Sequence, residues 1–268
     1  MIVLGRWLLS LLLLPELCGA GVTYQMRTQS FGRLAGGPTS SDYSVEGDRM
    51  RIEASDGKTV FIFRDETIYV LDTGAHSAQV RRHATLAESA RQIDESVKRL
   101  EVFAANAPAD RRATVDQAVA INKDIAARYH RPVLRDYRKT DRMESLEGRS
   151  CHVWEVWEQD AKWLELCVVP TAAVPGGAEA LAAMKSLSSY LHGGLFAVGV
   201  EFGPAPQWSD VESLAGVPVI VREFERGQLV REIQLTGFRA QSIDAPTFEV
   251  PQGYPVQDAP VTLPNAGG

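Results

Sequence analysis

The spacing of apolar residues along this 268-residue chain changes more than once, and each change marks a different kind of element. Short segments in which apolar and polar residues alternate are typical of strands, because successive side chains of a strand point to opposite faces. This alternation predicts strands over 22–31, 49–54, 59–64, 67–72 and 77–82. Asp56-Gly57 and Asp65-Glu66 are expected to be hairpin turns, and 36–41 (GGPTSS) is expected to be a loop.

A helical spacing replaces the alternation in the next part of the chain. Apolar residues recur at steps of three and four between 86 and 104, and again between 115 and 129. Thr85 and Glu88 offer a capping box for the first of these helices. Pro108 separates the two helices and Pro132 ends the second. The pattern therefore predicts a helical insertion over 85–131.

The strand pattern then returns and is interrupted once more by a helix. Strands are predicted over 134–140, 148–157 and 162–169, a helix over 178–191, and a hairpin of strands 217–225 and 228–238 around Arg226-Gly227. The last segment, 255–268, is rich in Pro, Gly and Asn and is expected to be a disordered tail. We therefore expect a single domain over 21–254, which contains the helical insertion.

Strands 59–64 and 67–72 are apolar on both faces of the hairpin that they form. Alternation places Phe61, Phe63, Ile68 and Val70 on one face. The other face carries another four large apolar side chains, which are Val60, Ile62, Tyr69 and Leu71. Each face must therefore be covered, by helices, by a partner or by a ligand.

Two cysteines lie in consecutive predicted strands. If Cys151 lies opposite Cys167, the pair forms a cross-strand disulfide, which stabilises by about 3 kcal/mol in the chain-entropy model. This register directs one apolar set inward, namely His152, Trp154, Val156, Leu164 and Leu166, with Lys162 at the end of the row. The cysteine face also carries Val153, Glu155, Trp157, Trp163 and Glu165, and it is expected to point outward or toward a loop. Two unpaired buried thiols are the alternative.

The hairpin around Arg226-Gly227 repeats this arrangement. With a regular two-residue turn, one face collects apolar side chains together with Arg222 and Arg231. The apolar members of that face are Ile220, Phe224, Leu229, Ile233 and Leu235.

The first 20 residues have the composition of a cleaved secretory signal peptide. Arg6 is followed by the apolar run 7–14 (WLLSLLLL), which is shorter than the roughly 20 residues that a membrane span needs. Cys18-Gly19-Ala20 places small residues before the expected cleavage site. A lipid anchor at Cys18 is disfavoured because Pro15, Glu16 and Leu17 do not form a lipobox. We expect a periplasmic or secreted protein, in which the two remaining cysteines can be oxidised.

Charge and motifs exclude several classes of function. The formal net charge of −6 argues against a nucleic-acid partner, since phosphate binding requires a basic face. No HExxH, CxxC or GxSxG motif occurs, and the five histidines do not have metal-ligand spacing. Glu155 and Glu165 are considered as an acid pair, but their expected outward orientation favours solvated surface. We therefore expect no enzyme activity, no catalytic residues, no metal and no cofactor.

Four short stretches point to a family when they are taken together. They are 47–53 (GDRMRIE), 68–72 (IYVLD), Gly148-x-x-Cys151 with Cys167 in the next strand, and 248–254 (FEVPQGY). Their order resembles a bacterial secreted family of unknown function that is related to the outer-membrane lipoprotein carriers, the LolA-like and LolB-like proteins. The resemblance implies an α+β fold, in which a curved antiparallel sheet forms a half-open barrel and helices cover its concave face. The carriers of this superfamily bind lipoprotein acyl chains in that concavity.

Together these features predict a non-enzymatic envelope protein that binds a lipid or lipoprotein acyl chain between sheet and helices. The alternative is an envelope interaction or scaffold module with a solid core and no ligand. Peripheral contact with a membrane or with envelope proteins is compatible with both, and the oligomeric state is left open. The residues expected to line the ligand site are Phe61, Phe63, Ile68, Trp154, Leu164, Leu166, Ile220, Phe224, Leu229 and Ile233.

Overall fold

A computed structural model describes residues 21–32, 36–130, 135–158, 160–192, 214 and 216–258. The signal peptide, Cys18 and the end of the expected tail, 259–268, lie outside the described residues. The strands are β1 (Gly21–Ser30), β2 (Thr39–Glu46), β3 (Arg49–Ala54), β4 (Thr59–Arg64), β5 (Thr67–Asp72), β6 (Ser77–Arg82), β7 (Arg135–Leu146), β8 (Arg149–Glu158), β9 (Ala161–Pro170), β10 (Gly216–Glu225), β11 (Gln228–Gln241) and β12 (Val256–Asp258). The helices are α1 (His83–Ala105), α2 (Arg112–His130), α3 (Gly177–His192) and the 3-10 helices η2 (Thr171–Ala173) and η5 (Ala245–Phe248).

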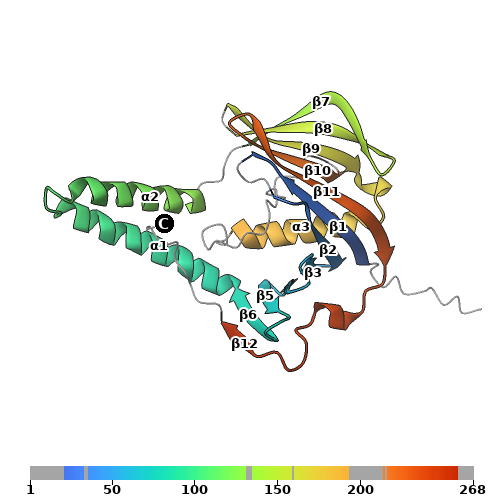
Figure 1. Ribbon diagram of the computed structural model, residues 1–268, viewed down its shortest axis with the longest axis horizontal. Helices are drawn as coiled ribbons and strands as arrows, with labels where there is room; N and C mark the ends of the chain where they lie inside the picture. The colour runs from blue at the N-terminus through green and yellow to red at the C-terminus, as the bar shows by residue number, and fades with distance from the viewer. Residues whose placement is uncertain are drawn as a thin grey trace, which may run out of the picture.

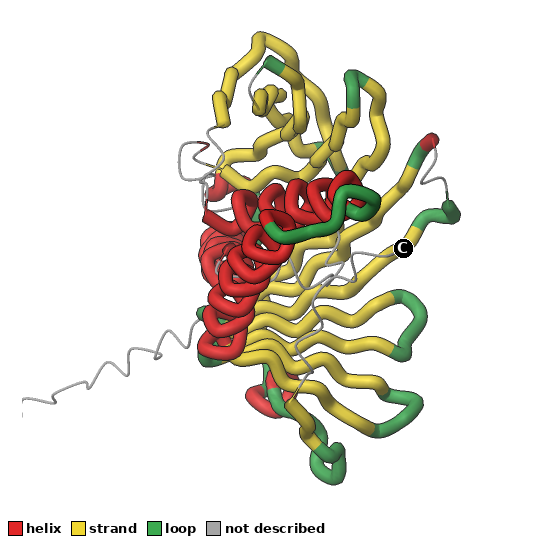
Figure 2. The backbone as a smooth tube through the Cα atoms, turned by 90° about the vertical axis from the view of Figure 1, so that its left-hand side faces the viewer, coloured by secondary structure: helices red, strands yellow, loops and turns green. Residues whose placement is uncertain are grey.

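All twelve strands form one open, curved sheet in the order β12-β6-β5-β4-β3-β2-β1-β11-β10-β9-β8-β7. Neighbouring strands are antiparallel, except that β12 runs parallel to β6. Figure 1 shows the sheet bending around α3, and Figure 2 shows the strands as one continuous band whose upper end curls over. The predicted α+β class with a curved, mostly antiparallel sheet is confirmed.

The sequence pattern missed strand β2. Its sequence, TSSDYSVE, contains two large apolar residues, Tyr43 and Val45, and its first residues belong to the segment that we expected to be a loop. Pairing on both sides, with β1 and with β3, gives the backbone of this segment its hydrogen-bond partners. Tertiary pairing therefore overrides the low strand propensity of Ser and Asp at this position.

Helix α3 covers part of the concave face of the sheet. Its last turn places Tyr190 edge-on to Phe63 of β4, and the Tyr190 hydroxyl donates a 2.7 Å hydrogen bond to the carbonyl oxygen of Arg81. At the other end of α3, Gly176 has a positive φ of 66°, and a Cβ atom at this position would lie 2.5 Å from Val22 Cβ. Only glycine allows the helix to begin so close to strand β1.

The C-terminal segment covers the opposite, convex face of β4, β5 and β6. Phe248 of η5 is fully buried there, and the guanidinium of Arg49 lies 4.8 Å from the centre of its ring. The apolar residues of this smaller core are Val60, Ile62, Leu71, Ala78, Ile243 and Phe248. The C-terminal segment thus covers the convex face of the Asp65-Glu66 hairpin, and on its concave face Phe63 and Ile68 are buried whereas Phe61 and Val70 are half-buried. The expected disorder of 255–268 is wrong for 256–258, because these residues form β12 and pair with β6.

Helices α1 and α2 form an antiparallel hairpin that projects from the body of the protein (Figure 1). We expected the helices to cover the concave face, but within the described residues this holds for α3, whereas α1 meets the sheet mainly at β6. Helix α1 also begins at His83 rather than after Thr85, and its N-cap residue, Arg82, makes no side-chain capping bond. The predicted capping box is therefore wrong.

Two of the predicted hairpin registers differ in the structure, and each of these hairpins contains a bulge. In β8–β9, Cys167 lies opposite Val153, two residues from the expected partner, and the Cys151–Cys167 disulfide runs diagonally with a Cα–Cα distance of 5.3 Å. The predicted disulfide is confirmed, while its direct cross-strand register is wrong. In β10–β11, a bulge between Glu223 and Phe224 pairs Ile220 with Gln234 instead of Ile233.

Candidate functional site

One line of apolar residues crosses the concave face of the sheet beside α3. Cross-strand pairing links Tyr24 of β1 to Tyr43 of β2, Tyr43 to Ile52 of β3, Ile52 to Phe61 of β4, and Phe61 to Val70 of β5. We call these five residues the concave row. Cross-strand neighbours on one face are close enough for their side chains to touch. The row is therefore a continuous apolar surface over five strands.

Exposure varies along the concave row. Tyr24 is 2% exposed and Ile52 is 7% exposed, whereas Tyr43, Phe61 and Val70 are half-buried. The neighbouring line of the same face lies under α3 and is buried throughout; it consists of Val22, Val45, Met50, Phe63 and Ile68. The helix thus seals one line of the concave face and leaves part of the next line open to contact.

Aromatic stacking fixes the buried end of the concave row. The Tyr24 ring stacks on Tyr43 with a centroid distance of 4.8 Å and on Phe238 of β11 with a distance of 5.0 Å. The Tyr43 hydroxyl lies 3.4 Å from Met26 Sδ, and the buried Tyr24 hydroxyl has no hydrogen-bond partner among the residues that the structure describes. Burial raises the pKa of both tyrosines well above the ordinary value, so both hydroxyls are neutral.

Small and polar residues border the row on its other side. Strand pairing places Ser41 opposite Met26 on one side and opposite Ala54 on the other, one step along the same face from the concave row. The corresponding residues of β4 and β5 are Thr59 and Asp72, which pair with each other. On β2, β4 and β5 the apolar surface beyond α3 is therefore one residue wide and ends at a polar margin.

The ten predicted lining residues differ in burial and do not share one face of the sheet. Six are buried at 4% exposure or less, namely Phe63, Ile68, Leu164, Leu166, Ile220 and Ile233. The other four, Phe61, Trp154, Phe224 and Leu229, are half-buried. Because of the bulge in β10–β11, Ile220 lies on the face opposite to Ile233, so the expected common face is wrong. Of the ten, Phe61 belongs to the concave row.

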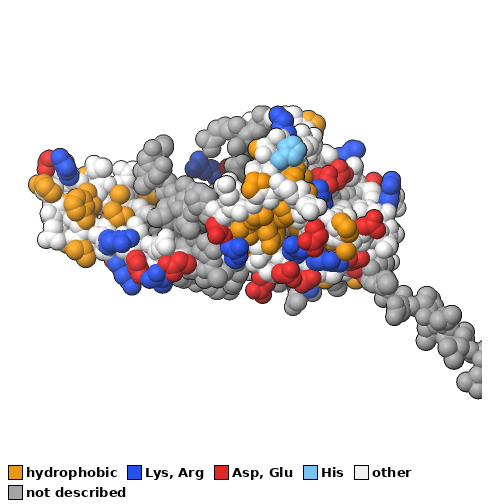
Figure 3. Space-filling model, turned by 90° about the horizontal axis from the view of Figure 1, so that it is seen from below, with side chains coloured by type: hydrophobic (Ala, Val, Ile, Leu, Met, Phe, Trp, Pro, Cys, Tyr) orange, Lys and Arg blue, Asp and Glu red, His pale blue; other side chains and the backbone are white. Residues whose placement is uncertain are grey.

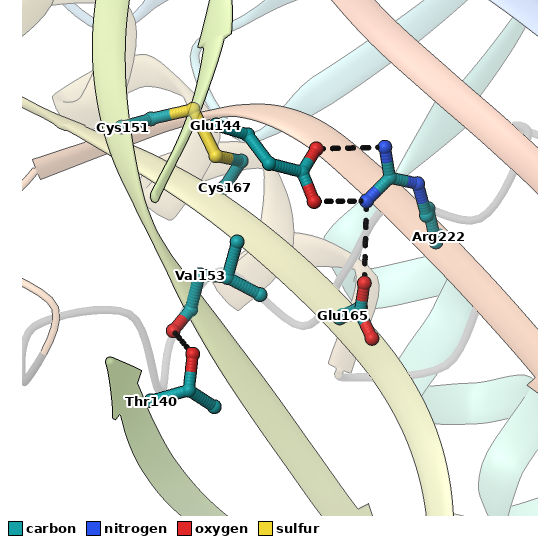
Figure 4. Close-up of a disulfide and its surroundings, with 7 residues drawn as sticks. All are labelled: Thr140, Glu144, Cys151, Val153, Glu165, Cys167 and Arg222. Atoms are coloured by element: carbon teal, nitrogen blue, oxygen red, sulfur yellow. Dashed lines mark hydrogen bonds and ion pairs between the residues drawn. A yellow bond between two sulfur atoms is a disulfide. The ribbon is translucent and has the colours of Figure 1, made fainter. Parts of the chain in front are cut away.

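The face opposite to α3 carries a cluster of ion pairs at the β7 end of the sheet (Figure 4). Arg222 of β10 donates to Glu144 of β7 at 2.8 and 2.9 Å, to Glu232 of β11 at 2.7 Å and to Glu165 of β9 at 3.2 Å. We call these four residues the arginine cluster. Arg222 therefore connects three other strands.

Glu165 is the most buried member of the arginine cluster, with 6% of its side chain exposed. Arg142 lies 2.7 Å and Lys162 3.1 Å from its Oε2 atom. Burial alone would raise the pKa of Glu165, but the hydrogen bonds and charges of Arg142 and Lys162 outweigh burial and lower it. The hydrogen bonds from Arg222 likewise lower the pKa of Glu144. Both carboxylates are charged at neutral pH.

The arginine cluster corrects the expected orientation of the cysteine face. Cys151 and Val153 are fully buried and Glu165 is 5% exposed, so this face does not point outward. His152, which we expected to point inward, is exposed. Val156, Leu164 and Leu166 are buried as expected, so both faces are buried here. The composition of the strands gave no signal for the burial of the cysteine face, because it results from β7 folding back over that face. Glu165 is therefore held in ion pairs within a buried face, whereas we expected it to lie on a solvated surface.

No group of three or more His, Cys, Asp or Glu residues in the described part of the chain is placed to hold a metal ion. Among the helices that the structure describes, none combines the length and the apolar character that a membrane crossing requires.

Comparison with known proteins gives weak structural likenesses. No protein-family model matches the sequence, and no curated protein matches it significantly. An uncharacterized conserved protein from Thermus thermophilus has a TM-score of 0.45 at 6% identity, with 90% of this chain and 91% of that chain covered. A LolA superfamily protein from Nitrosomonas europaea has a TM-score of 0.29 at 9% identity, covering 86% of this chain and 89% of that one. PNGF-II has a TM-score of 0.36 at 6% identity; 90% of this chain is covered, but the match spans 32% of PNGF-II. TM-scores below 0.5 establish neither a shared fold nor a shared function.

Proposed function

We propose that this protein is a non-enzymatic protein of the cell envelope that binds the acyl chain of a lipid or lipoprotein on the concave row beside α3. The observation that carries the proposal is that three residues of the row, Tyr43, Phe61 and Val70, are half-buried beside a helix-covered line that is fully buried. An acyl chain laid along this segment would remove apolar surface from water without breaking any hydrogen bond of the sheet.

The dimensions of the row suit a single chain. The part of the row from Tyr43 to Val70 crosses four strands, and strands lie about 4.8 Å apart, so its length is roughly 14 Å. Each lipid tail fills about half of a bilayer core that is roughly 30 Å thick. The polar margin at Ser41 and Asp72 offers hydrogen-bonding groups for a headgroup at the border of the apolar surface.

Two features support an envelope location. The Cys151–Cys167 disulfide requires an oxidising compartment to persist, and the first 20 residues have the composition of a secretory signal peptide. An extracytoplasmic protein that holds a lipid needs no covalent step, because binding and release at equilibrium suffice for transfer.

The test combines lipid analysis with a matched pair of variants. Natively purified protein is expected to release lipid that mass spectrometry detects, and delipidated protein is expected to bind a fluorescent fatty acid. Phe61→Ala on the concave face should weaken fatty-acid binding about tenfold, because burial of a large aromatic side chain contributes about 1.5–3 kcal/mol. Tyr69→Ala removes a half-buried aromatic residue from the convex face of the same hairpin and should leave binding unchanged.

A second candidate function rests on the buried residues. Phe63, Ile68 and Leu166, which we expected to line a ligand site, pack inside the main core at 4% exposure or less. This packing favours an envelope interaction or scaffold module with a solid interior. Natively purified protein without lipid, together with equal fatty-acid binding by Phe61→Ala and wild type, would select this function and reject the lipid carrier. Crosslinking that captures one other protein in a stoichiometric amount would then identify the partner.

A further inference from the structure

The α1–α2 hairpin carries exposed apolar side chains near its free end. Val102 is 67% exposed and Phe103 is 55% exposed, which places them among the most exposed large apolar residues of the described chain. Figure 3 shows apolar side chains gathered on this projecting part of the molecule, with basic and acidic side chains beside them. A valine and a phenylalanine side by side at the end of a projection have no role in the core.

Specific contacts nevertheless hold the end of the hairpin in place. Asn106 ends α1 by donating its side-chain amide to the carbonyl oxygen of Val102 at 2.8 Å, and Ala107 is buried in the turn. Lys123 of α2 lies 2.6 Å from Glu101 of α1, so an ion pair joins the two helices. Val102 and Phe103 are therefore held on an ordered turn of helix.

Basic residues surround the apolar pair. Residues 98–112 contain the exposed residues Lys98, Arg99, Arg111 and Arg112. The two acidic residues of this segment are Glu101, which is paired with Lys123, and Asp110. This end of the hairpin is thus net positive on a chain whose formal net charge is −6. Such a local reversal of charge is complementary to an anionic surface.

The spacing of the basic and apolar residues matches a lipid interface. Lys98 and Arg99 precede Val102 and Phe103 by four residues each, so each basic side chain lies on the same helix face, about 6 Å farther from the free end. When the end of the hairpin enters a bilayer surface, the apolar pair reaches the acyl region while the basic groups remain at the depth of the phosphates.

We propose that the free end of the α1–α2 hairpin, residues 98–112, is a docking site for an anionic lipid membrane surface. A second copy of the chain is also net negative and would match the basic residues, but it has no acyl region to receive Val102 and Phe103. The exposed apolar pair together with the positive charge therefore favours the membrane surface. The site is separate from the concave row, so each can exist without the other.

The experiment measures binding of the purified protein to vesicles. One set consists of phosphatidylcholine with about one third phosphatidylglycerol, and the other consists of phosphatidylcholine alone. Wild type should cosediment with the anionic set, and high salt should weaken this binding. Phe103→Ser should weaken binding about tenfold, since burial of an aromatic side chain contributes roughly 1.5–3 kcal/mol. K98Q/R99Q should weaken it about fivefold for each lost charge.

Matched controls use exposed residues elsewhere. Met143→Ser removes an exposed apolar side chain of β7, and R226Q/R239Q removes two exposed charges of the sheet. Both variants should bind within about twofold of wild type if the hairpin is the docking site. The proposal is overturned if wild type does not bind anionic vesicles, if it binds both vesicle sets equally, or if the hairpin variants bind like wild type. It is also overturned if sedimentation shows a dimer that V102S/F103S dissociates, because the hairpin would then join two copies.

Discussion

Arg222 and Glu144 are joined by two hydrogen bonds, of 2.8 and 2.9 Å, although β8 and β9 lie between their strands. In a flat sheet, strands three positions apart are separated by about 14 Å. The edge of the sheet must therefore curl until β7 faces β10. The Glu147 carboxylate confirms the curl, because it accepts a hydrogen bond from the backbone N–H of Gly237 in β11.

An irregularity in β7 accounts for the bend. The β7–β8 register shifts between Lys139 and Met143, where β7 contains two residues more than its partner strand. Inside the shift, the Thr140 hydroxyl donates a 2.8 Å hydrogen bond to the carbonyl oxygen of Val153. Bulges bend a strand and increase its local twist. The bulge thus brings Glu144 to Arg222 and encloses the disulfide.

The first prediction concerns the stability that Arg222 contributes. Arg222→Gln leaves Glu144, Glu165 and Glu232 without their common cation and should lower the free energy of unfolding by about 2 kcal/mol, since the cluster is partly but not fully buried. Chemical denaturation measures this change. Arg91→Gln on the projecting hairpin removes two exposed ion pairs and should cost less than about 0.5 kcal/mol. Equal losses in the two variants would contradict a structural role of the cluster.

The second prediction concerns acid. The pKa values of Glu144 and Glu165 are lower in the folded protein than in the unfolded chain, where a glutamate has a pKa of about 4.3. Their contribution to stability is therefore complete above that value and is lost as the pH falls through the folded pKa values. The free energy of unfolding should decrease below about pH 4.5. Glu144→Gln should reduce this dependence, and Glu66→Gln in the exposed β4–β5 turn should preserve it.

The third prediction concerns the disulfide. Reduction of Cys151–Cys167, which are 16 residues apart, should lower the free energy of unfolding by about 3 kcal/mol. Urea denaturation of wild type with and without dithiothreitol measures the loss. C151A/C167A is the control, and its urea midpoint should not respond to dithiothreitol. A wild-type midpoint that does not change on reduction would show that the bond does not stabilise the curl.

The fourth prediction concerns the segment on the convex face. Phe248 is fully buried beneath Arg49, so Phe248→Ala should cost about 3 kcal/mol and expose the segment 242–258 to proteases. Denaturation and limited proteolysis measure the two effects. Val256→Ala changes a residue of the same segment that is 48% exposed and should cost less than about 0.5 kcal/mol. Unchanged proteolysis of Phe248→Ala would mean that other contacts hold the segment.

The local pattern of the chain determined most of the strands and their turns. The bounds of β3, β4, β5 and β6 agree with the prediction, because alternation and turn residues are encoded within a few neighbouring positions. The side-chain faces of the Asp65-Glu66 hairpin were also predictable, since a two-residue turn fixes the register: Phe61 lies opposite Val70 and Phe63 opposite Ile68. Because both faces of this hairpin are apolar, the sequence also predicted that each face must be covered.

The candidate site was only partly predictable from the sequence. Phe61 was expected to line a ligand site, whereas Tyr24, Tyr43 and Ile52 were not, because their alignment depends on the pairing of β1, β2 and β3. β2 itself has too few apolar residues to be recognised. Residues from four strands enter the arginine cluster, and charged residues on separate strands carry no local signal of their contact.

What the sequence determined by itself is therefore most of the elements, the regular hairpins, the cysteine pairing and the two apolar faces of β4 and β5. The tertiary structure alone decided β2, the pairing of β12, the burial of the cysteine face and the projection of α1 and α2. The physical reason is the range of the interactions. Alternation and turn geometry act between neighbouring residues, whereas bulges shift a register by one or two positions and so change which distant side chains meet.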